Sequence, residues 1–160
     1  SASSALYRGD PTFGVTAHRM TAKIDGGEIV RVARFPVQSD DTCDTLFNRA
    51  LRATLDLFCK VCQELALVGH VAPTGDRWER AAVTRAEFER WMTLSPADPP
   101  DEIARKVRAL QHPRFPGPFF EIDGVRVEVP QDFDPINSSD SLSSLHQSNG
   151  ANESIRGKDE

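Results

Sequence analysis

Two strand-like segments around an Asp-Gly-Gly turn constrain the fold of this chain more than any other feature. Residues 14–20 and 28–37 are rich in β-branched side chains and partly alternate between apolar and polar residues, which is typical of strands. The Asp-Gly-Gly sequence that begins at Asp25 lies between them and is a strong turn signal. The pattern predicts a long β-hairpin that ends near Pro36, where a missing N–H group does least harm.

A long amphipathic helix is expected after the hairpin, over residues 42–67. We expect Asp41 to cap its amino end through the carboxylate and Gly69 to end it. Large apolar residues recur at spacings of three and four, so they form one stripe that predicts a face buried in a core. This stripe consists of Phe47, Leu51, Leu55, Phe58, Cys62 and Leu65. It is widened by Leu46, Ala50, Leu57 and Val61.

The following segments predict two shorter helices and a second hairpin. Thr84 and Glu87 fit a capping box for a helix that ends near Met92. A further helix is expected over residues 101–110, with apolar residues on one face. Asp-Gly between two short strand-like segments is the signature of a type I′ turn, which predicts a hairpin over residues 119–129. The apolar face of the second helix consists of Ile103, Val107 and Leu110.

Composition separates the last thirty residues from the rest of the 160-residue chain. Residues 131–160 hold six acidic and two basic residues and are rich in Ser and Asn. Such a segment buries too little apolar surface to offset the entropy of ordering, so we expect a disordered acidic tail. The net charge of the whole chain is −5, which leaves residues 1–130 nearly neutral. Charge therefore gives no support for nucleic-acid binding by the folded part, and we expect no DNA partner.

The cysteines and apolar runs favour a reduced, cytoplasmic protein without a membrane span. The chain has three cysteines, an odd number, and no secretory signal at its start, which is typical of a reducing compartment. The apolar run over residues 55–68 is interrupted by charged side chains, so it does not predict a transmembrane helix. Cys59 and Cys62 have the spacing of a metal or redox motif, but no second ligand pair follows. We interpret them as core cysteines and expect no metal site.

Two polar residues of the first hairpin have roles that spacing alone leaves open. His18 lies in a predicted strand, where a single histidine is more often a hydrogen-bonded structural residue than a catalyst. Asp25 is by default a turn residue. However, the backbone can close tightly around it because two glycines follow, and its carboxylate could then face a cleft.

The stretch GVTAHRMTAKIDGGEI, residues 14–29, resembles the G-V-T-x-H-x-M…D-x-G-x-I segment of formyltransferases that use 10-formyltetrahydrofolate. These enzymes include the glycinamide ribonucleotide, methionyl-tRNA and amino-sugar formyltransferases. Residues 101–109, followed by Pro116 and Gly117, resemble the start of the C-terminal domain that the methionyl-tRNA and sugar enzymes share. The resemblance covers roughly residues 5–130.

The resemblance implies an α/β fold in four parts. Residues 1–72 would be the C-terminal portion of a Rossmann-like catalytic domain, and residues 73–98 a linker with a short helix. Residues 99–130 would start a small α+β, barrel-like domain, and residues 131–160 would be the tail. The family's upstream Asn, His and parallel sheet have no counterpart in these residues. We therefore expect a fragment that is inactive alone.

The resemblance also implies a site. Asp25 matches the Asp of the family's catalytic Asn–His–Asp trio, where it holds the His charged and orders a proton-accepting water. The donor would be 10-formyltetrahydrofolate, whose pterin pocket the loop lines largely through backbone groups. The residues implied to bind it are Thr21, Ala22, Lys23, Ile24 and Asp25, with His18 near the pocket.

The amine acceptor is open between two substrates. A tRNA-binding enzyme benefits from a basic surface because phosphate contacts supply much of the affinity, and residues 1–130 show no dense Lys/Arg stripe. We therefore favour a nucleotide-linked amino sugar over methionyl-tRNA. A different class remains as an alternative, in which a truncated formyltransferase remnant acts as a non-catalytic binding module. The oligomeric state is not predicted.

Overall fold

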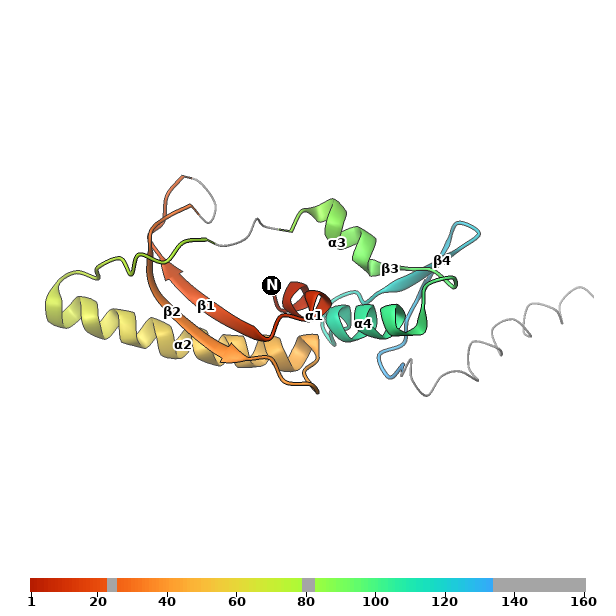
Figure 1. Cartoon of the computed structure of the whole chain (residues 1–160), viewed down its shortest axis with the longest axis horizontal. Helices are drawn as coiled ribbons and strands as arrows, with labels where there is room; N and C mark the ends of the chain where they lie inside the picture. Colours follow the sequence, from red (N-terminus) through yellow and green to blue (C-terminus); the bar gives the residue numbers. More distant parts are fainter. Residues whose placement is uncertain (23–25, 79–82, 134–160) are drawn as a thin grey trace, which may run out of the picture.

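The computed structural model describes residues 1–22, 26–78 and 83–133. Within these ranges the chain has mixed α/β structure, as predicted, with one two-stranded and one three-stranded sheet. The two sheets lie at opposite ends of the described structure, with helices between and beside them (Figure 1). Apart from its first three residues, the predicted acidic tail lies outside the described residues.

The predicted first hairpin is confirmed. Strand β1 (Thr12–His18) pairs antiparallel with β2 (Ile29–Pro36). The register shifts between Ala17 and His18, directly before the connecting loop. Such irregularities re-aim side chains and are frequent next to functional sites. The register shift therefore changes the direction of the backbone at His18, where the chain leaves the sheet.

Helix α2 (Cys43–Val68) confirms the predicted long helix and its end. Gly69 adopts a left-handed conformation with φ 79° and donates its N–H to the Leu65 carbonyl, which favours glycine at that position. The predicted cap is wrong by one residue, because Thr42 is the N-cap and forms a capping box with Thr45. Asp41 instead lies just outside the helix.

The predicted core stripe of α2 is also wrong. The buried side chains of the helix include Leu46, with 0% of its surface exposed, and Leu57, with 8%. By contrast, Leu55 and Phe58 on the predicted stripe are 59% and 64% exposed. The hairpin covers one side of the helix. On the side with the stripe, Phe47 packs edge-on against His112, and the large apolar residues that follow it on the stripe are at least half exposed. Cys59 and Cys62 are exposed as well, so they are not core cysteines. The exposed stripe consists of Phe47, Leu51, Leu55, Phe58 and Leu65.

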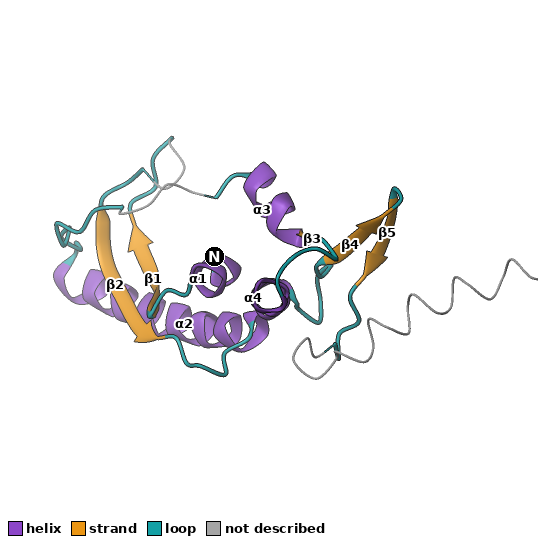
Figure 2. Ribbon diagram, turned by 45° about the vertical axis from the view of Figure 1, so that its right-hand side comes forward, coloured by secondary structure: helices purple, strands orange, loops and turns teal. Residues whose placement is uncertain are grey.

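Short helices fill the middle of the structure. Helix α1 (Ala2–Arg8) contacts both α2 and α4 (Pro100–Leu110), and lies between the hairpin and α4 in Figure 2. Helix α3 (Arg85–Met92) begins with the predicted capping box between Thr84 and Glu87. The predicted apolar face of α4 is confirmed, since all three of its residues are buried.

The second sheet contains the predicted hairpin and one strand that the sequence does not predict. Strands β4 (Phe119–Ile122) and β5 (Val125–Glu128) pair antiparallel. Asp123 and Gly124 between them both have positive φ, as a type I′ turn requires. Strand β3 (Thr93–Leu94) pairs parallel with β4 and is too short to produce a sequence pattern.

One hydrophobic core joins residues from all four helices. Leu6 from α1, Leu46 from α2, Met92 from α3 and Leu110 from α4 belong to the same buried cluster. A second cluster lies between α4 and the three-stranded sheet. The predicted division of the chain into four parts, with boundaries after residues 72, 98 and 130, stays a prediction. The second cluster contains Leu94, Ile103, Val107, Phe120 and Val129.

Candidate functional site

The loop between β1 and β2 carries the predicted site. Its described flanks are residues 19–22 and 26–28, and Thr21 and Ala22 on the first flank are exposed. Lys23, Ile24 and Asp25 lie outside the described residues, so their positions and roles stay predictions. The two flanks contact each other and neighbouring segments, and these contacts hold the base of the loop.

The two flanks approach each other closely at Gly27. A β-carbon on Gly27 would lie 1.7 Å from the Arg19 carbonyl oxygen, so only glycine fits there. The Arg19 N–H donates to the Glu28 carbonyl at 2.9 Å. The Arg19 guanidinium also forms an ion pair with the Glu28 carboxylate at 3.2 Å. The loop therefore leaves and re-enters the hairpin through a narrow base.

His18 is half-buried at the start of this base. Its Nδ1 lies 3.1 Å from the Arg19 carbonyl oxygen. Because a carbonyl oxygen can only accept, this hydrogen bond needs the proton on Nδ1 and puts the acceptor lone pair of the neutral ring on Nε2. The imidazole packs edge-on against the Trp78 indole, with ring centroids 5.1 Å apart. His18 thus lies at the loop, near the residues predicted to line the pterin pocket.

A third segment, residues 70–78, lies against the hairpin at this point, which the sequence does not predict. The Thr74 N–H donates to the Ile29 carbonyl at 2.9 Å. The Trp78 indole N–H donates to the Gly27 carbonyl at 3.1 Å. One sequence signal could have identified this segment. Trp78 is a large aromatic residue in a connection otherwise rich in Pro, Gly and charged residues, and a fully exposed linker seldom contains tryptophan.

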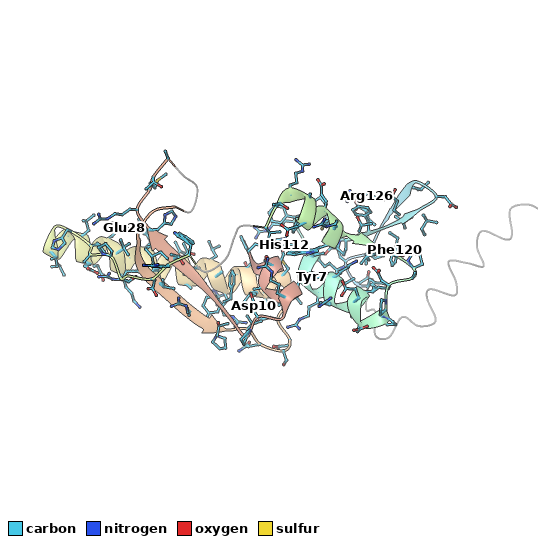
Figure 3. All side chains as sticks on the ribbon, turned by 45° about the horizontal axis from the view of Figure 1, so that its top comes forward. Tyr7, Asp10, Glu28, His112, Phe120 and Arg126 are labelled. Carbon is cyan, nitrogen blue, oxygen red and sulfur yellow. The ribbon has the colours of Figure 1, made fainter. Side chains whose placement is uncertain are left out.

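Two cavities lie outside the loop itself. One, of about 310 Å³, is lined by Phe13, Arg34 and Trp78 among others. The other, of about 830 Å³, is lined by parts of all of α1, α2, α3 and β4, and includes His112. Figure 3 shows Glu28 at the loop and His112 in the separate part of the molecule near α1 and α4. The larger cavity is therefore not part of the predicted site.

Ionisable groups of the described residues form no metal site. In residues 1–22, 26–78 and 83–133, no three His, Cys, Asp or Glu side chains are grouped as metal ligands. In the same ranges no helix is long and apolar enough to cross a bilayer.

The family model described as formyl transferase matches residues 1–62. The methionyl-tRNA formyltransferase of Burkholderia multivorans is 28% identical over 125 residues, covering 78% of this chain and 38% of that protein. A 4-N formyltransferase from Francisella tularensis has a similar fold, with a TM-score of 0.71 and 19% identity over 83% of this chain and 55% of that one.

A second solved structure has a similar fold. The N-formyltransferase from Helicobacter canadensis, in complex with folinic acid and dTDP-3-aminofucose, has a TM-score of 0.62 and 19% identity over 78% of this chain and 46% of that one. The chain thus spans roughly two fifths of the curated relative and about half of the solved structures. The sequence match, the family model and the shared fold agree with one another. Residues 1–62 thus match the formyl transferase family model, and the chain resembles members of that family in sequence and in fold.

Proposed function

We propose that this chain provides part of an enzyme that transfers a formyl group from 10-formyltetrahydrofolate to a primary amine. The observation that carries the proposal is the loop base at Gly27, where the backbone closes within the segment that resembles the family's folate loop. A β-carbon on Gly27 would fill this base, so Gly27 serves the backbone conformation. The family resemblance implies that this loop recognises the pterin ring largely through its backbone groups.

Each predicted residue has a role that fits this chemistry. Attack of the amine on the formyl carbon develops negative charge on oxygen and positive charge on nitrogen. Asp25 would keep the catalytic His charged and order the water that accepts the proton. Thr21, Ala22, Lys23 and Ile24 would contact the pterin largely through backbone groups, with His18 beside them. The catalytic Asn and His would come from chain that lies outside these 160 residues, so we expect the chain alone to be inactive.

For the acceptor we propose a nucleotide-linked amino sugar. The near-neutral charge of residues 1–130 supports this choice, because tRNA binding depends on phosphate contacts from basic residues. A structural relative with a nucleotide-linked amino sugar bound, the Helicobacter canadensis enzyme, adds support at the level of fold. Methionyl-tRNA is the second candidate, and the sequence relative from Burkholderia multivorans favours it. A non-catalytic remnant is the alternative from another class.

The test is an assay of the complete protein that contains these residues, with 10-formyltetrahydrofolate as donor. The two acceptors are methionyl-tRNA and a panel of nucleotide-linked amino sugars. We expect formylation of at least one sugar and none of the tRNA. Efficient formylation of the tRNA alone would overturn the choice of acceptor. Absence of transfer to either acceptor, with folate binding retained, would favour the non-catalytic module.

A further inference from the structure

We infer that Trp78 is a positioning residue that holds together the base of the folate loop, at residues 18–19 and 26–28. Residues 70–78 then belong to the donor site, although the sequence predicts most of them to be a linker. This inference rests on the proposed function only in what the loop binds. That the loop base is held by Trp78 is a separate claim about the chain, and it can be tested without any substrate.

Trp78 contacts both flanks of the loop with one side chain. Its ring packs edge-on against His18, the last residue of β1, which leads directly into the first flank. Its indole N–H donates to the carbonyl of Gly27, on the flank where the chain returns to β2. Loss of the indole would therefore remove one contact from each flank at once.

The segment that carries Trp78 is itself fixed to the hairpin along its length. It runs back from the end of α2 across the tip of β1 and β2 (Figure 1). The Arg19 guanidinium donates to the Val71 carbonyl at 3.3 Å, and the Arg31 guanidinium to the Ala72 carbonyl at 3.2 Å. These bonds and the backbone bond from Thr74 to Ile29 fix the direction in which Trp78 enters the loop base.

Backbone recognition explains why the base needs support. A loop that binds its ligand through N–H and C=O groups has no side chain to adjust when its backbone shifts, so a loop that must be ordered on binding has a lower affinity for its ligand. At the narrow base, the Arg19 carbonyl lies close to Gly27, and the Arg19 N–H is bonded to the carbonyl of Glu28. Trp78 lies behind this base, where it sets loop geometry without contacting the reacting atoms.

The first experiment measures loop geometry directly by amide hydrogen exchange in the 160-residue chain. Trp78→Ala removes both contacts, and Trp78→Phe keeps an aromatic ring but removes the N–H donor. Trp91→Phe is the matched control, because Trp91 packs on Tyr7 in the helical core, away from the loop. We expect exchange at residues 19–22 and 26–28 to become about tenfold faster in Trp78→Ala and less so in Trp78→Phe, with no change in the control.

The second experiment measures donor use in the complete protein. We expect Trp78→Phe to raise KM for 10-formyltetrahydrofolate about tenfold while kcat at saturating donor changes less than about threefold, because the loop is reassembled by bound donor. Trp91→Phe should leave both constants unchanged. Lowered kcat with unchanged KM would overturn the positioning role.

The outcomes separate this inference from the proposed function. If the wild-type protein transfers no formyl group, the proposed function fails, and the exchange measurement still decides whether Trp78 holds the loop base. If Trp78→Ala does not fold, Trp78→Phe decides instead. Exchange at the loop flanks that is the same in wild type and in the folded Trp78 variant would overturn the inference.

Discussion

Arg108 of α4 donates its Nε hydrogen to the backbone carbonyl oxygen of Asp41 at 2.7 Å. Its Nη2 donates to the Gln38 carbonyl at 2.9 Å. The Asp41 carboxylate, inside the same turn, accepts from the Gln38 N–H at 2.7 Å and the Thr45 hydroxyl at 3.0 Å, and pairs with Arg49. One turn therefore joins the end of the hairpin, the start of α2 and the later helix α4.

Substituting Arg108 should weaken this junction. Arg108→Ala removes charge-assisted donors from two carbonyl oxygens, which we expect to cost about 1–3 kcal/mol of unfolding free energy. Urea denaturation followed by circular dichroism measures the change. Arg85→Ala is the control, because the Arg85 side chain is exposed and pairs with Glu89 one turn away on the same helix. Equal midpoints for both variants would contradict the role of Arg108.

Asp41 should make the chain sensitive to acid. Burial alone would raise the pKa of Asp41, but hydrogen bonds from the Gln38 N–H, Thr45 and Arg49 outweigh it and lower the pKa below its ordinary value. Since the folded pKa lies below the unfolded one, the unfolded chain binds the extra proton first. The stabilisation is present above about pH 4, the unfolded value, and is lost as pH falls through the folded pKa.

The comparison for Asp41 is with Asp41→Asn. We expect wild type to be the more stable protein at pH 7 and the difference between the two to shrink as pH falls below about 4. Denaturant unfolding at a series of pH values measures this difference. A difference that is constant with pH would show that the Asp41 charge does not contribute.

Gly27→Ala should disrupt the loop base. The added methyl would lie 1.7 Å from the Arg19 carbonyl oxygen, so the two flanks must move apart. We expect a loss of about 1–3 kcal/mol in stability and faster amide exchange at Arg19 and Glu28. Gly117→Ala is the control, because its β-carbon would meet only the Gln131 amide at 4.0 Å. Stability and amide exchange in Gly27→Ala that equal those of wild type would contradict the close approach.

The exposed stripe of α2 should cause self-association of the isolated chain. Large exposed apolar patches favour association in water, and Leu55 and Phe58 are more than half exposed. We expect the double variant Leu55→Glu, Phe58→Glu to sediment as a monomer under conditions where wild type associates. Leu57→Ala, on the buried face, should instead lower stability by about 2–4 kcal/mol. Wild type that is monomeric at high concentration would contradict this prediction.

Asp25→Asn tests the residue that the family resemblance places at the catalytic centre. In the complete protein we expect turnover to fall by about 10³-fold or more, because the neutral amide cannot hold the catalytic His charged. Folding should change little, and circular dichroism and thermal unfolding provide that control. Turnover close to wild type would remove Asp25 from the mechanism.

Local signals were sufficient to predict most helices and strands. A capping box at Thr84, a C-terminal glycine at Gly69 and an Asp-Gly turn at Asp123 each act within a few residues, so the sequence pattern and the structure agree. Strand β3 could not be predicted, because two residues carry no periodicity and Thr93 and Leu94 pair with a strand about 25 residues later. The candidate site shows the same contrast. The turn of the loop was predicted from adjacent residues, whereas the contact of Trp78 with the loop base, which joins distant residues, was not.

By itself the sequence determined the hairpin and the long helix and indicated the formyltransferase resemblance, because periodicity, turn residues and a motif are all properties of short stretches. Only the tertiary structure decided which face of α2 is buried. Two apolar rows lie on that helix. The hairpin and the neighbouring helices bury the row with Leu46 and Leu57, while Phe58 remains exposed. Burial depends on which surfaces meet, and that is set by contacts between segments distant in sequence, as is the contact of Trp78 with Gly27 across 51 residues.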